Sequence, residues 1–260
     1  MSSEIDQSVA SRGILGAPVL DVQDRRPNAV RASAPGVDLY RPPRLNLSVE
    51  HVLRVQGYND PARVRPAIRA AAESAAALVR QSSTPAVWSR RVAVTGLADD
   101  RLSLDGGVTL TSPAFAKYFA GCTEAVAFVL TLGGAFDTIR QNMNADRLLE
   151  MVLMDAAGWM AIEEATQAFT RHIGGKAQAD GMQTTRRLAP GYAFRIGDAK
   201  VEWKLEDQEQ LFTLFAGVDL PVRLLESCAM LPRMSRSGLF GLRPAAPLDA
   251  IETRNPEVSS

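Results

Sequence analysis

The sequence is poor in cysteine, in histidine and in excess charge, and each shortage excludes a class of protein. Cys122 and Cys228 are the only cysteines and have no CxxC spacing, which favours two free thiols in a reducing compartment over a disulfide. His51 and His172 have no metal-ligand spacing with them, so we expect no metal site. Lysine plus arginine and aspartate plus glutamate number 29 each, so the overall charge predicts neither a nucleic-acid partner nor an anionic membrane.

Several longer signals are missing as well. No apolar run is long enough to span a bilayer, and the start of the chain at Met1–Glu4 lacks the basic segment and apolar core of a secretory signal. We therefore expect a cytoplasmic protein. The chain has no GxGxxG loop, no phosphate-loop lysine and no GxSxG elbow, which argues against a dinucleotide-binding domain and against a hydrolase of the elbow type. These motifs predict no catalytic side chain.

The composition that remains is that of an ordinary globular protein, with 46% hydrophobic and 22% charged residues. Helical patterns alternate with hairpin-like runs of period two, which favours an α+β fold over a regular βαβ array. The expected helices are 48–55, 61–80, 113–119, 135–143, 145–173 and 205–215, and the expected strands are 87–94, 102–104, 125–132 and 222–230.

The two ends of the chain differ from its middle. Residues 1–44 are rich in Ser, Pro, Arg and Gly and have poor hydrophobic periodicity, so we expect an extended or disordered arm. The structured body is expected to cover residues 45–243, and the proline-containing residues 244–260 are expected to form a tail. Within the body, the longest helix is expected to end at Gly174-Gly175, a common C-terminal stop, before a polar connection to Thr185.

The segment Arg186–Tyr192 contains the best candidate site. Its Pro190-Gly191 pair fits the central positions of a type II turn, because proline presets the first φ and glycine accepts a positive second φ. Such a turn fixes the directions of Arg187 and Tyr192, which offer a fork for a carboxylate and an aromatic ring with a hydroxyl. On the residues alone, a simple turn with a solvated arginine and a tyrosine packed in the core explains the segment as well.

Two further blocks follow this turn along the chain. Trp203–Phe212 reads Trp-x-Leu-x-x-Gln-x-x-Leu-Phe, and Pro232–Gly238 reads Pro-x-x-Ser-x-Ser-Gly. Together with Arg-x-x-Pro-Gly-Tyr at Arg187–Tyr192, they resemble the activation domain of cobalamin-dependent methionine synthase in its short stand-alone form. The resemblance covers about residues 45–243, with its specific motifs within 187–243. It implies a twisted, mainly antiparallel sheet with flanking helices, and a protein that binds S-adenosylmethionine (SAM).

The resemblance also implies roles for individual residues. Arg187 would pair with the methionyl carboxylate of SAM, and Tyr192 would flank its sulfonium methyl. An acid in the longest helix would balance the positive charge of the ligand, and Glu163 fits better than Glu164 because the family's apolar lead-in precedes it. A solvated helix face explains either glutamate equally well. The implied SAM-binding residues are Arg187, Ala189, Gly191, Tyr192 and Glu163, with Ala189 acting through its backbone.

A serine- and glycine-containing loop is expected after Pro232. By resemblance it would contact the corrinoid partner, although a plain turn between two strands explains it as well. Relatives usually have lysine before the first serine, where this chain has Met234, and Arg233 and Arg236 would supply the charge instead. The tyrosine pair of the full-length enzyme has no evident match beyond the loop. The residues expected in this loop are Ser235, Ser237 and Gly238.

The implied function is reactivation of a corrinoid methyltransferase in support of methionine biosynthesis. The protein would hold SAM over the cobalamin carried by a partner, methionine synthase or a related corrinoid protein, while a separate donor supplies one electron. Placement and exclusion of water would suffice, without an acid or base from this chain. One alternative is a binding or assembly module that has lost SAM binding, as Met234 and the missing tyrosine pair suggest. Another is a small-molecule methyltransferase, which the missing glycine-rich loop disfavours.

Overall fold

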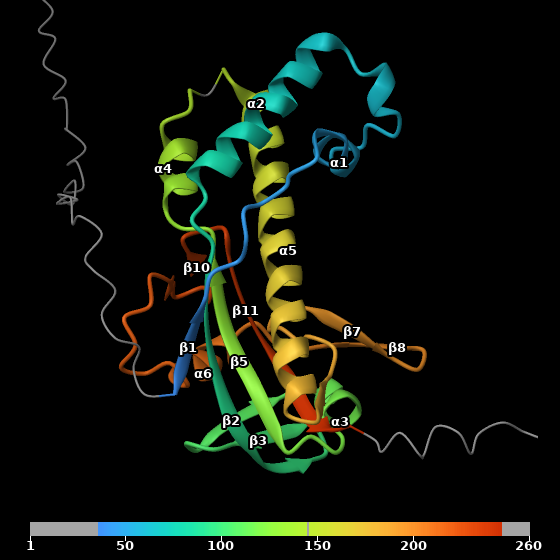
Figure 1. The fold of residues 1–260 in the computed structure, drawn as a ribbon, viewed down its shortest axis with the longest axis vertical. Coiled ribbons are helices and arrows are strands. Elements are labelled where there is room, and N and C mark those ends of the chain that lie inside the picture. The colour runs from blue at the N-terminus through green and yellow to red at the C-terminus, as the bar shows by residue number, and fades with distance from the viewer. Residues whose placement is uncertain (1–35, 145, 246–260) are drawn as a thin grey trace, which may run out of the picture. The chain divides into compact units, whose positions relative to one another are not determined.

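The computed structural model describes residues 36–144 and 146–245. These residues form an α+β fold, as expected, in which helices pack on the faces of a mainly antiparallel sheet (Figure 1). The strand order is β4-β3-β2-β5-β11-β6, and β1 pairs with β2 beside this path. The sheet strands are β1 (Val37–Tyr40), β2 (Ala86–Ala98), β3 (Arg101–Leu104), β4 (Val108–Thr111), β5 (Glu124–Thr131), β6 (Met182–Thr184) and β11 (Ser235–Pro244), and the separate hairpins are β7 (Ala193–Ile196) with β8 (Ala199–Glu202) and β9 (Arg223–Leu224) with β10 (Met230–Leu231).

Helices form in the segments where the sequence predicts them, with shifts at their ends. Ser48 accepts a hydrogen bond from the backbone N–H of His51, which confirms the first predicted N-cap. Ser112 accepts one from Ala114 ahead of Pro113 at the first helical position, which confirms the second. The helices are α1 (Val49–Val55), α2 (Pro66–Ser82), α3 (Pro113–Tyr118), α4 (Ala135–Gln141), α5 (Leu148–Ala179) and α6 (Asp207–Thr213), and a short 3-10 helix η1 (Pro61–Arg63) precedes α2.

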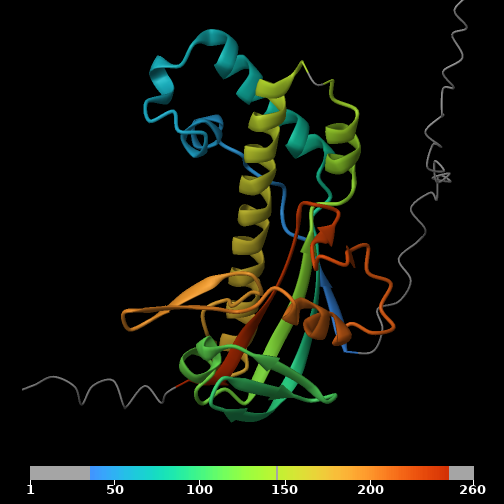
Figure 2. The same cartoon turned by 180° about the vertical axis from the view of Figure 1, so that it is seen from behind.

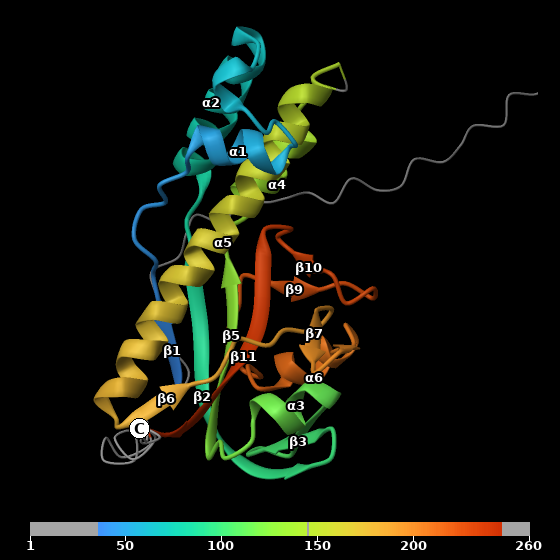
Figure 3. The same ribbon diagram turned by 90° about the vertical axis from the view of Figure 1, so that its right-hand side faces the viewer.

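Helix α5 crosses one face of the sheet, and Figure 3 shows it running alongside β2, β5 and β11. It has 32 residues, so at 1.5 Å per residue it is about 48 Å long. Many of its buried residues are alanines, which let the helix approach the sheet closely. Phe169 of α5 packs against Phe128 of β5 and Phe240 of β11, at ring-centroid distances of 5.2 and 6.1 Å. This packing positions the C-terminal half of α5 beside β11.

The end of α5 differs from the prediction. The sequence predicts a stop at Gly174-Gly175, yet the helix continues to Ala179 and the chain turns at Gly181, whose φ is 69°. Ile173 and Ala177 are buried on either side of the glycine pair. Tertiary packing therefore outweighs the low helix propensity of the two glycines. Strand β6 then occupies part of the expected polar connection to Thr185.

The opposite face of the sheet is covered by α3, α6 and the β7–β8 hairpin (Figure 2). Trp203, which directly follows β8, is fully buried and lies edge-on to Phe115 of α3 at a centroid distance of 5.0 Å. The indole N–H of Trp203 donates to Asp207 at 2.9 Å, and Asp207 also accepts from the backbone N–H of Thr111. These two bonds anchor the start of α6 to β4.

The described structure extends beyond the predicted limits of the body at both ends. The sequence places the start near Leu45, but Val37–Tyr40 already forms β1. This strand is ordered because its backbone completes the hydrogen bonds along one edge of β2. At the other end β11 continues to Pro244. The remainder of the predicted arm and tail, residues 1–35 and 246–260, lies outside the described residues.

Two elements near the C-terminus also differ from the prediction. The single strand expected over 222–230 is instead the short β9–β10 hairpin. Ser235, Ser237 and Gly238 are not in a loop but in the first half of β11, where Ser235 pairs with Thr131 of β5. Polar and glycine residues predict a turn when they face solvent. In this strand they are largely buried, and tertiary partners satisfy their hydroxyls.

Among residues 36–144 and 146–245, no helix is long and apolar enough to cross a membrane. The same residues contain no group of three or more His, Cys, Asp or Glu side chains placed to hold a metal ion. Cys122 and Cys228 are both buried free thiols.

Candidate functional site

A hydrogen-bonded turn at Ala189–Tyr192 forms the centre of the site. The backbone N–H of Tyr192 donates to the carbonyl of Ala189 at 3.3 Å, and the φ of Gly191 is 77°, as a type II turn requires. The backbone N–H of Gly191 donates to the carbonyl of Trp203 at 2.7 Å, and the backbone N–H of Trp203 donates to the carbonyl of Tyr192 at 3.1 Å. A Cβ on Gly191 would lie 3.1 Å from the exposed Leu205 side chain, a tight contact, but the positive φ is the main reason for glycine here. The predicted turn is confirmed, and the buried tryptophan fixes its place.

The residues on either side of this turn are held against one another. The guanidinium carbon of Arg187 lies 5.5 Å from the ring centroid of Tyr192, within cation–π range. Between them in sequence, Leu188 exchanges two backbone hydrogen bonds with Leu239 of β11, at 2.8 and 2.9 Å. The Nη1 atom of Arg187 is buried and has no hydrogen-bond partner among the described residues. Arg187 therefore keeps one desolvated donor for a further acceptor.

Glu163 and Arg236 form an ion pair beside this turn. Nη1 of Arg236 donates to the Glu163 carboxylate at 2.6 Å and to the Thr166 hydroxyl at 3.0 Å. The Arg236 side chain is 5% exposed and its guanidinium carbon lies 5.5 Å from the Trp159 ring centroid, whereas Glu163 is 48% exposed. Glu164 instead accepts the backbone N–H of Asn46 at 2.8 and 3.0 Å. Of the two glutamates, it is Glu163 that lies on the side of the arginines.

The charges of these groups influence one another. Burial raises the pKa of Glu163, but the hydrogen bond and charge of Arg236 and the charge of Arg187 outweigh it, so this pKa lies below its ordinary value. Burial, followed by the charge of Arg236, lowers the pKa of Arg187. Arg187 remains protonated at neutral pH all the same, because the guanidinium pKa is very high. The cluster therefore contains two positive charges and one negative charge.

Two hollows lie next to the turn, and Tyr192 lines both. The larger has a volume of about 190 Å³ and the smaller about 140 Å³. Each is smaller than the roughly 300 Å³ of the smallest typical sites for drug-sized ligands, so a ligand of that size needs both hollows or a movement of Tyr192. The larger is lined by Trp159, Ile162, Pro190, Tyr192, Gln208, Met230, Arg233, Met234, Ser235, Arg236 and Ser237, and the smaller by Arg186, Arg187, Ala189, Tyr192, Ala193 and Phe194.

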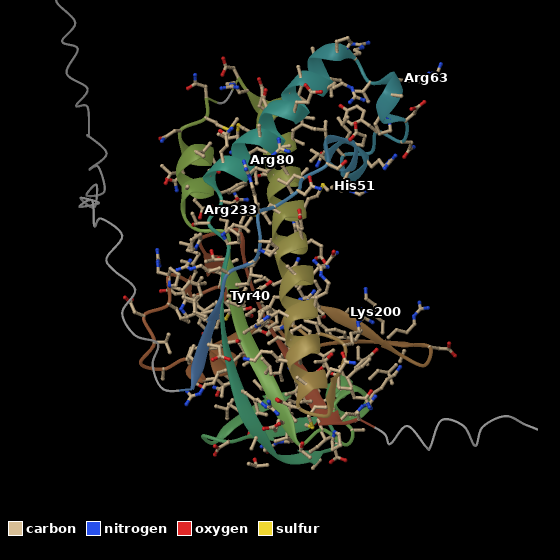
Figure 4. All side chains as sticks on the ribbon, viewed as in Figure 1. Tyr40, His51, Arg63, Arg80, Lys200 and Arg233 are labelled. Atoms are coloured by element: carbon tan, nitrogen blue, oxygen red, sulfur yellow. The ribbon has the colours of Figure 1, made fainter. Side chains whose placement is uncertain are left out.

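Arg233 reaches the larger hollow from the end of the sheet near α4. Figure 4 labels it there, away from Lys200 on the β7–β8 hairpin. Its backbone N–H donates to Asp137 of α4 at 2.8 Å. The neighbouring Met234 packs against α5, where a Cβ on Gly158 would lie 2.8 Å from its terminal methyl. At the position where the resemblance implies lysine, this chain thus has an apolar packing residue, with an arginine beside it at the hollow.

The two serines of β11 line the larger hollow, but their hydroxyls are engaged. Ser235 donates to the Thr131 hydroxyl at 2.9 Å. Ser237 donates to Gln208 of α6 at 2.9 Å, and the amide N–H of Gln208 donates to the Cys228 carbonyl at 2.6 Å. Gln208 is 2% exposed, so this network ties α6 to β11 under the hollow.

Gly238 does not line either hollow. A Cβ at this position would lie 2.7 Å from the Leu188 carbonyl oxygen and 2.8 Å from the Phe128 ring. The glycine is therefore required where the Arg187 segment bridges to β11. Its position is explained by packing within the chain, whereas the sequence suggested close approach at a binding surface.

Three residues of the site were missed or misplaced by the sequence analysis. Trp159 is 55% exposed at the larger hollow. The sequence signal for it is a tryptophan one helical turn before Glu163 in an alanine-rich helix. Gln208 stands in one of the three motif blocks, but its bonds to β11 come only from the tertiary structure. Arg236 was expected as a loop charge and is instead a buried partner of Glu163.

Comparisons with known proteins give one informative result. No family model and no curated protein matches this chain. Among solved structures, the chain is similar to the MetH reactivation domain in its crystal structure bound to AdoHcy (S-adenosylhomocysteine). The TM-score is 0.54 and the sequence identity 15%, over 82% of this chain and 80% of that one. At this identity the likeness shows the fold alone, and this chain has the fold of the MetH reactivation domain.

Proposed function

We propose that this protein binds SAM and supports reductive methylation of the cobalamin carried by a partner methyltransferase, methionine synthase or a related corrinoid protein. The observation that carries the proposal is the contact between Arg187 and Tyr192 beside two hollows. The fold supports it, because the MetH reactivation domain has been crystallised with AdoHcy, which is SAM without its methyl group.

The proposed roles follow from the geometry of the turn. Arg187 has a buried donor without a partner among the described residues, which suits the carboxylate of an amino-acid ligand. A shielded bond of this kind contributes on the order of 1–3 kcal/mol. Tyr192 is 38% exposed at both hollows, where its ring would flank the sulfur of SAM. Gly191 and the backbone of Ala189 hold the turn that aims these two side chains.

The partner would approach where the aromatic side chains are exposed. Trp159 and Tyr192 are both large, exposed and at the rim of the larger hollow. Covering them would exclude water from the ligand, and a water-free, aligned arrangement is what methyl transfer between two bound groups requires. The reduction itself needs an electron from a separate donor.

The test combines the protein with its candidate cobalt(II) partner, a reductant and SAM. We expect the absorption spectrum of methylated cobalamin to appear with the wild-type protein. With Arg187→Ala we expect it not to appear. Arg101→Ala, at an exposed position on β3, is the matched control and should behave as wild type. An unchanged rate with Arg187→Ala would remove the site assignment.

A second candidate is an assembly module for a corrinoid protein that no longer binds SAM. One observation favours it. The resemblance assigns Glu163 to the ligand, but its carboxylate already accepts a hydrogen bond from Arg236. Titration with SAM by calorimetry separates the two candidates. Absence of heat and of saturation, with a folded protein, would favour the module.

A further inference from the structure

The walls of the two hollows carry charge of one sign. Four arginines are among the described lining residues, and no aspartate or glutamate is. Two of these arginines interact with the carboxylate of Glu163. Arg236 donates a hydrogen bond to it, and the charge of this carboxylate acts on the pKa of Arg187. The lining arginines are Arg186, Arg187, Arg233 and Arg236.

The charge of Glu163 is already paired within the chain, because its Oε2 atom accepts a hydrogen bond from Arg236. Arg236 is almost completely buried and has two hydrogen bonds in the structure, to Glu163 and to Thr166. Removing Glu163 from the pair would leave a buried guanidinium without a counter-charge, which is strongly unfavourable. Trp159 lies over the same guanidinium and further restricts its movement. A positive ligand at the larger hollow therefore meets a neutralised carboxylate rather than an available one.

We propose that Arg236 sets the charge selectivity of this site, so that the neutral thioether AdoHcy binds at least as tightly as the sulfonium SAM. The inference rests on the proposed function. SAM and AdoHcy share every group that Arg187 and the turn would hold, and they differ in the methyl group and in the charge on sulfur. Because Arg236 offsets the charge of Glu163, a positive sulfur at the larger hollow gains no net attraction from the pair, and the charge of Arg233 disfavours it. A neutral sulfur is not affected by these charges in this way.

This selectivity has a consequence for turnover. Methyl transfer converts the bound sulfonium into the thioether, which is the form that the site would retain. The product would then leave slowly, and free AdoHcy would compete with SAM for the site. The protein would thereby respond to the ratio of the two compounds.

Calorimetric titration of SAM and of AdoHcy into the wild type and four variants tests the proposal. Wild type should bind AdoHcy at least as tightly as SAM. Arg236→Met keeps an apolar side chain against Trp159 but leaves the charge of Glu163 unpaired. It should change the ratio of the two dissociation constants about tenfold in favour of SAM binding, which is about 1.4 kcal/mol. Glu163→Gln leaves Arg236 uncompensated and should shift it towards AdoHcy. Arg171→Met, at an exposed position on α5, is the control and should keep the wild-type ratio.

The double variant distinguishes charge from structural damage. Arg236→Met combined with Glu163→Gln again has no net charge in the pair, so its ratio should return to that of wild type. Damage to the fold would instead accumulate in the double variant. If Arg236→Met does not fold, an unchanged ratio in Glu163→Gln overturns the proposal.

The outcomes also separate this proposal from the proposed function. If neither compound binds to the folded wild-type protein, both proposals fail. If both bind but wild type prefers SAM tenfold or more, or if Arg236→Met leaves the ratio unchanged, only the charge selectivity is overturned.

Discussion

Gly238→Ala is expected to be among the most damaging single substitutions near the site, although it adds only one methyl group. The added Cβ would lie 2.7 Å from the carbonyl oxygen of Leu188 and 2.8 Å from the ring of Phe128. A backbone oxygen cannot move aside as a flexible side chain does. Relief therefore requires separation of the bridge in which Leu188 and Leu239 exchange two hydrogen bonds.

The magnitude follows from these two costs. Overpacking a core by one methyl group costs about 1–3 kcal/mol, and each backbone hydrogen bond weakened adds about 0.5–1.5 kcal/mol. With two such bonds, we expect a loss of about 2–6 kcal/mol in the free energy of unfolding. For a folded body of this size, that corresponds to a decrease in Tm of roughly 4–24 °C.

Thermal unfolding followed by circular dichroism measures the effect. Gly175→Ala is the matched control, because that glycine is in exposed helix with nothing within 4 Å of an added Cβ. It should raise stability by about 0.5–1 kcal/mol, since alanine is the better helix former. A Tm for Gly238→Ala within about 1 °C of wild type, or an equal loss in both variants, would refute the reasoning.

Three further predictions concern single side chains. Arg187→Ala should weaken SAM binding about 10- to 100-fold by calorimetry, and an unchanged affinity would contradict its role. Gln208→Ala should lower the free energy of unfolding by about 1–3 kcal/mol in urea, because the buried carbonyl of Cys228 loses its donor; a loss below about 0.5 kcal/mol would contradict this. Because the pKa of Glu163 is depressed by Arg236, its contribution to stability is present above about pH 4.3 and is lost as the pH falls through the lower, folded pKa. The advantage of wild type over Glu163→Gln in urea midpoint should therefore shrink between pH 7 and pH 3, and a constant difference would contradict the pairing.

The location of the elements was largely predictable because their signals are local. The N-caps at Ser48 and Ser112, the buried strand near 125–132 and the turn at Pro190-Gly191 each depend on a few neighbouring residues. Such signals fail where distant packing decides. The glycine pair at 174–175 has the local pattern of a helix end, but the flanking residues are buried against the sheet and the helix continues.

The sequence by itself determined the α+β class, the turn that aims Arg187 and Tyr192, and the absence of the common nucleotide and hydrolase motifs. Only the tertiary structure decided that Arg236 is buried on Glu163 and that Ser235 and Ser237 belong to a strand. The physical reason is the range of the interactions. Turn and cap geometry is set by adjacent dihedral angles. The charge at the site depends instead on side chains that α5 and β11 bring together, and Glu163 and Arg236 are 73 residues apart in the sequence.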